Sequence, residues 1–200
     1  MYDYDLIVVG AGHAGCEAAA AAANMGSSVL LVTMNMAVIA QMSCNPAMGG
    51  VGKGQIVREI DALGGYSGII SDLSTVQFRM LNKSKGPAMW SPRTQNDREL
   101  FAHTWRLRLE QTPNVHFRQD TVVGLETDRS LDGKVRVSGV HLSIGGTLSC
   151  RSVILTNGTF LSAVMHIGEK QFGGGRAGEK AAHGITEQLA EFGFLSGRMK

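Results

Sequence analysis

The first 33 residues constrain the fold most strongly, because they carry the pattern of a strand, a glycine turn, a helix and a second strand. Residues 5–9 form a short apolar run that ends in glycine, which is typical of a buried parallel strand. Residues 14–25 contain six consecutive alanines, whose small side chains allow a helix to lie close against a sheet. A second apolar run at residues 28–33 completes a βαβ unit with a right-handed crossover.

The turn between the first strand and the helix carries a GxGxxG motif, which predicts a dinucleotide site at this junction. Gly10 permits the tight turn, Gly12 admits a pyrophosphate to the backbone, and Gly15 lets the helix pack closely on the strand. The N-terminus of the helix then faces the phosphates. Glu17, in the first helical turn, is a carboxylate at the positive end of the helix dipole.

The acidic residue that usually binds the adenosine ribose at the end of the second strand is missing. A hydroxyl, an amide or the backbone must make any ribose contact instead. This absence weakens NAD as the first ligand more than FAD, whose contacts are spread over a longer molecule. The residues at the equivalent positions are Thr33, Met34 and Asn35.

The remaining pattern alternates helical segments with strands and predicts an α/β protein. We expect a Rossmann-like FAD-binding fold with a central parallel sheet and an inserted antiparallel meander, of the flavoprotein type that has two dinucleotide-binding domains. One FAD-binding domain, the N-terminal part of a longer protein, is expected to span residues 1–200. After the βαβ unit we expect a glycine-rich loop at 41–54 and a helix at 55–63 with Ile56, Ile60 and Leu63 on one face. A loop at 83–92 and a helix at 94–111, which carries Leu100, Phe101 and Leu107, are expected next. The remaining expected elements are a meander at 115–144 with an LDGK turn at 131–134, a buried strand at 152–156, a loop at 173–175 and a helix at 179–192.

Composition excludes several classes of protein. The chain has 19 basic and 17 acidic residues, so it lacks the basic excess of a dedicated nucleic-acid module. Its three cysteines form no CxxC pair, which favours a reducing, cytoplasmic setting and argues against a disulfide reductase. The six histidines show no metal-ligand spacing, so we expect no metal site. The apolar runs are shorter than the roughly 20 residues of a membrane span, and we expect neither export nor a membrane anchor.

Cys44 is the candidate catalytic residue, because it is the one cysteine inside a polar, glycine-rich loop. A nearby Lys53 or a helix dipole would favour its thiolate, whereas the alternative is a cysteine that only packs within the loop. The GGVGKG sequence of this loop is not a phosphate loop, because Ala47 and Gly54 replace the first glycine and the final hydroxyl of that motif. A set of basic residues either binds an anionic polymer or forms a solvated helix face: Lys83, Lys85, Arg93, Arg98, Arg106 and Arg108.

Several longer motifs resemble one family closely. They are GxGHAGxEAA at 10–19, SCNPAMGGVGKG at 43–54, VREIDALGG at 57–65, NKSKGPAMWSPRTQNDR at 82–98, GTFL at 158–161, HIG at 166–168 and GGRAGE at 174–179. Together they cover nearly the whole chain, and the cysteine loop is far more specific than GxGxxG. The chain resembles the N-terminal part of the MnmG family, also called GidA, whose members are FAD-containing tRNA wobble-uridine modification enzymes.

The resemblance implies a reaction, cofactors and partners. Members of the family add an aminomethyl or carboxymethylaminomethyl group to C5 of uridine 34 in tRNA, with methylenetetrahydrofolate as carbon donor and FAD and NADH for the redox steps. They act as homodimers together with the GTPase MnmE. The family usually has serine where this chain has Ala182, so a backbone contact with FAD is expected there. The residues that the resemblance assigns to FAD are Gly10, Ala11, Gly12, His13, Ala14, Gly15, Val122 and Ala182.

Family members are much longer than 200 residues, so the resemblance places the NADH-binding region and the C-terminal helical region outside this chain. We therefore expect the fragment alone to be inactive. Three alternatives stay open: another FAD-dependent oxidoreductase, a folate-dependent tRNA methyltransferase of the TrmFO type, and a non-catalytic scaffold that binds a dinucleotide or tRNA.

Overall fold

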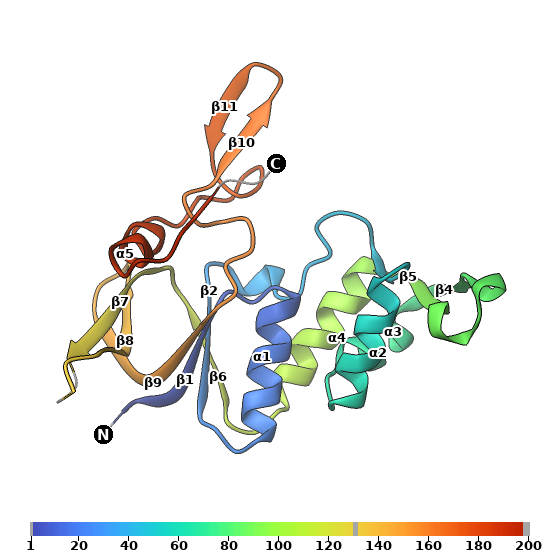
Figure 1. Cartoon of the computed structure of the whole chain (residues 1–200), viewed down its shortest axis with the longest axis horizontal. Helices are drawn as coiled ribbons and strands as arrows, with labels where there is room; N and C mark the ends of the chain where they lie inside the picture. Colours follow the sequence, from blue (N-terminus) through green and yellow to red (C-terminus); the bar gives the residue numbers. More distant parts are fainter. Residues whose placement is uncertain (1, 130–131, 198–200) are drawn as a thin grey trace.

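The computed structural model describes residues 2–129 and 132–197 and is built around a six-stranded sheet (Figure 1). The order of the strands is β6-β2-β1-β9-β8-β7. β2, β1 and β6 are parallel, and β9 is parallel to β1 but antiparallel to β8. The bounds are β1 Tyr4–Val9, β2 Val29–Thr33, β6 Val115–Gln119, β7 Val122–Arg129, β8 Val135–Leu142 and β9 Thr147–Leu155.

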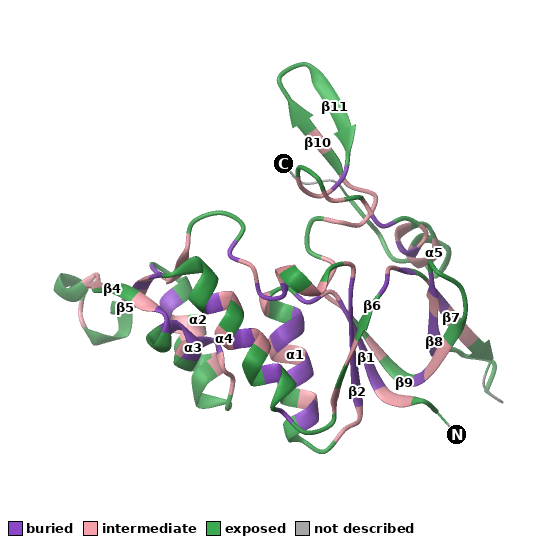
Figure 2. Cartoon of the chain, turned by 180° about the vertical axis from the view of Figure 1, so that it is seen from behind, coloured by how far each residue is buried: buried purple, intermediate pink, exposed green. Residues whose placement is uncertain are grey.

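Alternate residues of β1 and β2 face opposite sides of this sheet and build two cores. Helix α1 (His13–Asn24) and helix α4 (Arg98–Glu110) lie on one side of the sheet, and both carry buried residues (Figure 2). The buried alanines of α1 belong to one core cluster with Phe101, Trp105 and Leu109 of α4. The strands β7 to β9 fold against the other face together with Ile185 of α5 (Ile185–Glu191). Short side chains on α1 therefore bring its N-terminus close to the ends of the parallel strands.

A second unit lies beyond α4 and consists of a three-stranded antiparallel sheet and two helices (Figure 1). We call it the small lobe, residues 45–96. Its elements are β3 Ala47–Gly49, α2 Lys53–Ala62, α3 Ser67–Leu73, β4 Thr75–Leu81 and β5 Ser91–Asn96, in the sheet order β3-β5-β4, with 3-10 turns at Lys83–Lys85 and Pro87–Met89. Glu17 joins the lobe to α1, because its carboxylate accepts hydrogen bonds from the backbone N–H groups of Tyr66 and Ser67 at the start of α3.

Two smaller features complete this description of the chain. A 3-10 turn, Met36–Val38, follows β2. A hairpin of β10 (Val164–Ile167) and β11 (Lys170–Gly173) projects from the body of the molecule (Figure 1). None of the helices in the described ranges has the length and apolar character needed to cross a membrane.

The structure confirms the α/β Rossmann-like fold, and it corrects the expected meander. Residues 115–119 form β6, which pairs in parallel with β2 instead of joining the meander. An edge strand of a parallel sheet has one exposed face, so its alternating pattern resembled that of an antiparallel strand. The antiparallel part consists of β7, β8 and the first three residues of β9. The expected LDGK turn falls partly on residue 131, which lies outside the described residues.

The expected helix at 94–111 is also too long, because residues 94–96 belong to β5. The helix begins after Asp97, whose side chain accepts hydrogen bonds from the N–H groups of Glu99 and Leu100 as an N-cap. Its buried face carries Phe101, Trp105 and Leu109, whereas Leu100 and Leu107 are exposed.

Other boundaries shift as well. The final helix begins at Ile185 instead of residue 179, and α2 begins at Lys53. Ile56 of α2 and Leu63, the residue that follows α2, are exposed in this chain. The strand after the meander is less buried than its apolar pattern predicted, since Ile154 is exposed. Among the described elements, α3, β4, β10 and β11 had no sequence signal that we recognised, and β3 lies within the expected glycine-rich loop.

Candidate functional site

A cavity of about 480 Å³ lies at the carboxyl ends of β1 and β2. The glycine turn lines it on one side, and the segment after β9, residues 156–160, lines it on the other. Ligands of open α/β sheets bind in the crevice outside the carboxyl ends of the strands, so this is the position expected for a nucleotide. We call it the dinucleotide cavity.

Each glycine of the motif has a separate structural role. Gly10 has φ +102°, and a Cβ there would lie 2.6 Å from the carbonyl oxygen of Thr156. A Cβ on Gly15 would lie 1.8 Å from the carbonyl oxygen of Gly10, so only glycine allows α1 to start this close to β1. Gly12 differs, because a Cβ there would meet nothing within 4 Å. The protein needs Gly10 and Gly15 for packing, while Gly12 keeps the cavity side of the turn open.

The glycine turn fits the phosphates of a dinucleotide. Gly12 is the N-cap of α1, and no side chain caps the helix there. Its first N–H groups therefore lack side-chain partners and face the cavity side of the turn, where the helix dipole favours an anion. Asn157, which also lines the cavity, has a buried Oδ1 without a hydrogen-bond partner in the described structure. Thr156 fixes the opposite wall, because its hydroxyl donates to the carbonyl oxygens of Val9 and Gly10 at 2.9 Å.

His13 and Cys16 support the turn from within the core. His13 Nε2 lies 3.1 Å from the carbonyl oxygen of Ala40, and its ring packs against Phe101 with the centroids 5.3 Å apart. Burial lowers the pKa of His13, which favours the neutral imidazole. The Cys16 thiol donates to the carbonyl oxygen of Ala11, and burial raises its pKa to about 12. Both side chains hold the turn: Cys16 is fully buried, whereas His13 is half-buried.

The residues at which the sequence analysis expected a ribose contact lie at the carboxyl end of β2. Thr33, Met34 and Asn35 all line the dinucleotide cavity, and the amide oxygen of Asn35 accepts a hydrogen bond from the N–H of Ala37. The Asn35 side chain thus offers its amide nitrogen at the position where many dinucleotide sites have a carboxylate.

Asp120 is an acid in the cavity lining that the sequence analysis missed. Burial raises the pKa of its carboxyl, but hydrogen bonds from the Ser143 hydroxyl and from the N–H groups of Thr121 and Ile144 outweigh it, with help from Arg118. The pKa therefore lies below its ordinary value. Asp120 follows β6 directly, and its position was hidden because that strand was assigned to the meander.

The two more distant residues assigned by the resemblance, Val122 and Ala182, also line the cavity and are buried. The N–H of Ala182 donates to the carbonyl oxygen of Phe160, and its carbonyl oxygen accepts from the N–H of Ser162, both at 2.8 Å. Because these two hydrogen bonds use the N–H and one lone pair, a backbone contact between Ala182 and a ligand would use the second lone pair of the Ala182 carbonyl oxygen. Of the residues that the sequence assigned, His13, Ala14 and Gly15 lie in the first turn of α1 behind the lining.

Arg176 stands at the rim of the cavity and was not singled out from the sequence. Its Nη1 donates to Gln41 Oε1 at 3.0 Å and lies 3.8 Å from Glu179 Oε2, while its guanidinium lies over the ring of Phe160. These contacts connect the GGRAGE segment to the loop that carries Cys44. An arginine inside a glycine-rich segment was the signal that could have identified it.

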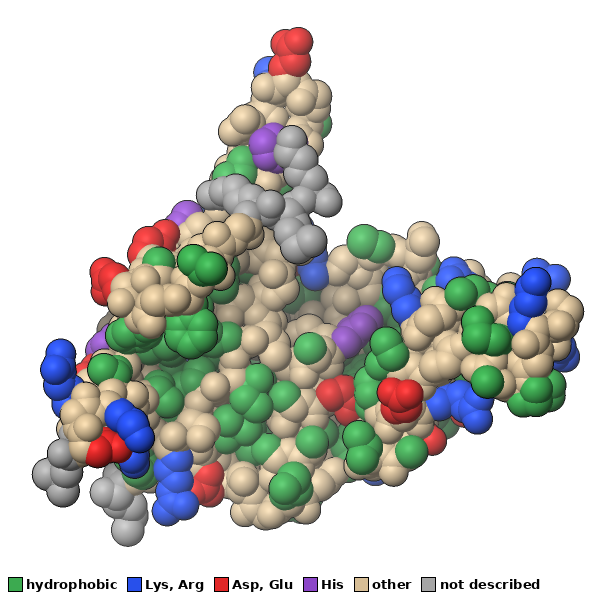
Figure 3. Space-filling view, viewed as in Figure 1, with side chains coloured by type: hydrophobic (Ala, Val, Ile, Leu, Met, Phe, Trp, Pro, Cys, Tyr) green, Lys and Arg blue, Asp and Glu red, His purple; other side chains and the backbone are tan. Residues whose placement is uncertain are grey.

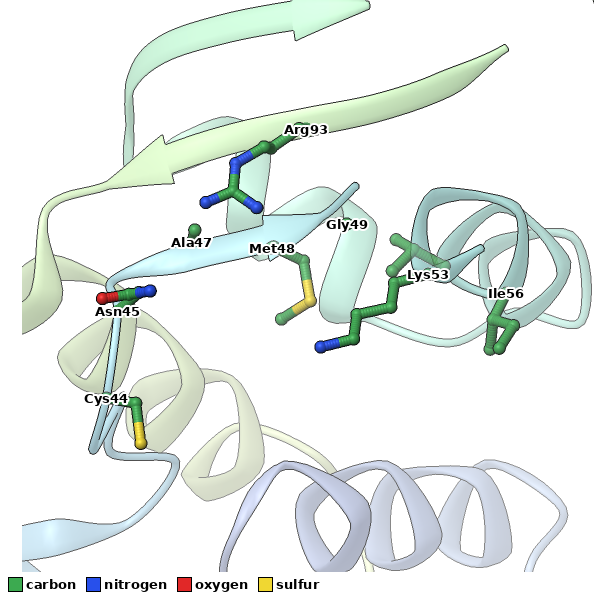
Figure 4. A pocket seen from close by; sticks show the side chains of 9 residues that line it. Cys44, Asn45, Ala47, Met48, Gly49, Lys53, Ile56 and Arg93 are labelled. Atoms are coloured by element: carbon green, nitrogen blue, oxygen red, sulfur yellow. The ribbon is translucent and has the colours of Figure 1, made fainter. Parts of the chain in front are cut away.

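Cys44 lines a different cavity, of about 360 Å³, between the cysteine loop and the small lobe (Figure 4). Lys53 of α2 and Arg93 of β5 line it too, so the lysine that the sequence paired with Cys44 lies in the same cavity, while the thiol points away from it (Figure 4). Arg98 holds the loop by donating from Nη2 to the carbonyl oxygen of Cys44 at 2.7 Å. Cys44 is exposed, whereas Cys16 and Cys150 are buried. Among the described residues, this cavity shares no lining residue with the dinucleotide cavity.

Comparison with known proteins identifies the family. The family model described as glucose inhibited division protein A matches residues 5–200. A curated relative from Cytophaga hutchinsonii, named tRNA uridine 5-carboxymethylaminomethyl modification enzyme MnmG, is 69% identical over 198 residues, covering 99% of this chain and 31% of that protein. A relative of the same name from Porphyromonas gingivalis is 58% identical, again over 31% of its length. The chain thus spans about a third of the length of these relatives.

Solved structures agree with the sequence comparison. GidA from Aquifex aeolicus superimposes with a TM-score of 0.90 at 41% identity, covering 96% of this chain and 31% of that one. The GidA-related protein from Thermus thermophilus shares the fold, with a TM-score of 0.66 at 22% identity, covering 96% of this chain and 69% of that one. The family match over nearly the whole chain and the high identity to its curated members lead to one conclusion: this chain belongs to the glucose inhibited division protein A family, whose relatives compared above carry the name MnmG.

Proposed function

We propose that this chain is the FAD-binding part of a tRNA-modifying flavoenzyme that adds an aminomethyl or carboxymethylaminomethyl group to C5 of wobble uridine 34. The names of the relatives at 58 to 69% identity support tRNA uridine modification. The proposal further includes NADH as reductant, methylenetetrahydrofolate as carbon donor, the GTPase MnmE as partner, a homodimer and a cytoplasmic location. Residues 1–200 form the FAD-binding domain, and the other activities belong to the whole protein.

The open glycine turn is the single observation that carries the FAD part of the proposal. Gly12 leaves free space at the start of α1, whose uncapped N–H groups are suited to a pyrophosphate. Thr156 and His13 keep this turn in place through their bonds to Val9, Gly10 and Ala40. When bound, FAD would supply the electron-transfer chemistry, and the buried Val122 and Ala182 would help to exclude water from the cavity.

Cys44 is proposed as the nucleophile that activates the uridine. Addition of a thiolate to C6 of a uracil ring makes C5 nucleophilic, so that C5 can form a bond to a one-carbon unit. The exposed thiol shares its cavity with Lys53 and Arg93, whose positive charges suit an anionic RNA. Replacement Cys44→Ser in the full-length protein should abolish modification of uridine 34 without loss of bound FAD. Near-normal modification by this variant would rule out the assignment.

The first experiment is an absorbance spectrum of the purified protein, followed by anaerobic addition of NADH. We expect about one FAD per chain and bleaching on reduction. Gly12→Ala is the matched variant, because its methyl group meets no protein atom but occupies the open side of the turn. It should melt like the wild type and bind FAD at least about tenfold more weakly, since a phosphate can no longer approach the backbone closely.

The flavin spectrum, together with an assay of the tRNA product, separates the alternatives. A protein that binds FAD and is reduced by NADH but leaves tRNA unchanged is a different oxidoreductase. Transfer of a methyl group to tRNA instead of an aminomethyl group indicates a folate-dependent methyltransferase. A protein that binds no FAD, even when it is supplied, contradicts the flavoenzyme proposal and leaves a scaffold without chemistry.

A further inference from the structure

Two arginines lie directly opposite each other on the sheet of the small lobe. Arg79 of β4 and Arg93 of β5 are paired in register, so both side chains stand on the same face. Gln77 and Gln95 flank them on that face, and the four residues line a shallow cavity of about 320 Å³ together with Leu81. Guanidinium and amide groups are hydrogen-bond donors, so this cavity is built to receive oxygen acceptors.

The arginine pair has no acidic partner among the described residues of this chain. Like charges directly opposite on antiparallel strands destabilise a sheet. None of the ion pairs found among the described residues includes Arg79, Arg93, Lys53, Lys83 or Lys85. An arrangement that costs stability and lacks an internal counter-charge points to an anion supplied from outside.

The positive charge continues from this face to Cys44. Arg93 lines both the shallow cavity and the Cys44 cavity, and Lys53 is also in the lining of the Cys44 cavity (Figure 4). The Arg93 guanidinium also lies against the glycine loop, since a Cβ on Gly50 would be 3.3 Å from its Nη1. Arg79, Arg93 and Lys53 therefore line two adjoining cavities, and the second of these is the one that Cys44 also lines.

The lobe as a whole is more basic than the rest of the chain. Residues 45–96 contain six basic and three acidic residues, whereas the whole chain contains 19 and 17. Two of the three acids, Asp61 and Asp72, line a cavity with Phe78 and Met80, which stand on the opposite face of the sheet. The space-filling view shows lysine and arginine side chains gathered at the end of the molecule formed by β4 and β5 (Figure 3).

An exposed aromatic residue lies among these cations at the tip of the lobe. The Trp90 indole N–H donates to the carbonyl oxygen of Lys83 at 3.2 Å, which fixes the ring beside Lys83 and Lys85. Trp90 is 38% exposed. A fixed aromatic ring among cations is the combination that binds single-stranded nucleic acid, through base stacking and phosphate contacts.

The structure also separates the basic residues that the sequence grouped together. Arg98 binds the carbonyl oxygen of Cys44, Arg106 pairs with Glu110 at 2.8 Å, and Arg108 lies over the ring of Tyr66. These three have structural partners. Lys83, Lys85 and Arg93 have no counter-charge within the described chain, and they lie on the small lobe with Arg79.

We propose that this cationic face, formed by Lys53, Arg79, Lys83, Lys85, Arg93 and Trp90, binds the sugar–phosphate backbone of the RNA substrate and leads the target base to Cys44. The inference deepens the proposed function, because it rests on an RNA substrate and names the surface that takes it. RNA fits better than an acidic protein segment, because the two arginines, the glutamines and the tryptophan match phosphates, 2′-hydroxyls and bases in turn.

The test is RNA binding by the purified holoprotein, with an unmodified anticodon stem–loop RNA as the probe. Arg79→Gln/Arg93→Gln removes the pair, and Arg136→Gln/Arg151→Gln is the control that removes two exposed charges from β8 and β9. We expect the first variant to bind RNA at least about tenfold more weakly and to lower the slope of log affinity against log salt by about 1 to 2. The control should match the wild type in both measurements. Bound FAD should be unchanged in both variants.

Each contrary outcome has a definite meaning. Wild-type RNA affinity and salt slope in the Arg79/Arg93 variant would overturn the inference and leave the proposed function intact. Equal loss in both variants would also overturn it, because the effect would then come from net charge alone. Loss of reduction by NADH with normal RNA binding would assign the arginines to the reductant instead. A wild-type protein that binds FAD but no RNA would overturn the RNA substrate itself, and with it the inference.

Discussion

At the scale of single residues, the three cysteines should differ sharply in reactivity. Cys44 is exposed, whereas burial raises the pKa of Cys16 to about 12 and also raises that of Cys150. A thiol reagent applied at about pH 8 should therefore modify one thiol per native chain and three in denaturant. The count is read from the absorbance of the released chromophore.

Cys44→Ser provides the control for this titration, because it should leave no rapidly reacting thiol in the native protein. Reaction of two or three thiols at the same rate in the native wild type would show that the core around α1 or β9 opens readily. That result would contradict the packing described for Cys16 and Cys150.

At the scale of elements, the contact between α1 and α3 depends on one carboxylate. Glu17 accepts hydrogen bonds of 2.6 to 3.1 Å from the backbone N–H groups of Tyr66 and Ser67. Glu17→Ala removes this cap and should lower the free energy of unfolding by roughly 1–3 kcal/mol, measured by urea denaturation. Glu59→Ala, on the exposed side of α2, is the control and should change it by less than about 0.5 kcal/mol. Equal effects of the two substitutions would show that the cap is not used.

The arginine pair makes the opposite prediction for stability. Replacing Arg79 with glutamine removes a like-charge contact with Arg93 across β4 and β5. The variant should be as stable as the wild type or more stable by roughly 0.2–1 kcal/mol in low salt, as judged by thermal unfolding. If the gain in stability were as large in high salt as in low salt, electrostatic repulsion between the two arginines would not be its cause.

The elements that the sequence predicted well are those with a continuous apolar pattern. β1, α1 and β2 lie within one or two residues of their expected bounds, because strands buried on both faces and an alanine-rich helix leave little ambiguity. β6 was misplaced because partner strands are set by tertiary packing, which an alternating pattern does not encode. The residues of the dinucleotide cavity were likewise predictable only where a local motif marks them. Gly10, Gly12 and Gly15 were found from their motif, whereas Asp120, Asn157 and Arg176 reach the cavity only through the fold.

At the scale of the whole molecule, Asp120 links regions that are distant in sequence and should influence acid stability. Its pKa in the folded protein lies below the ordinary value near 4, so folding favours the ionised form. This contribution is present above about pH 4 and is lost as the pH falls through the folded value. Asp120→Asn should therefore lose less stability than the wild type between about pH 5 and 3, measured by urea denaturation at each pH.

Asp72→Asn, on the exposed surface of α3, is the control and should keep the wild-type pH dependence. If the stability of Asp120→Asn depended on pH in the same way as that of the wild type, the hydrogen bonds from Ser143, Thr121 and Ile144 would not depend on the charge of the Asp120 carboxylate. The acid sensitivity would then have to come from other carboxylates.

The strand β9 has a consequence for how the protein comes apart. Its first three residues pair antiparallel with β8, and the residues from Cys150 onward pair in parallel with β1. A single strand therefore carries the backbone hydrogen bonds of both halves of the sheet. Neither half can lose its order without disturbing the other, so the amide protons of β1, β8 and β9 should exchange with solvent as one cooperative unit, while the small lobe, attached through helices, opens at a lower energy.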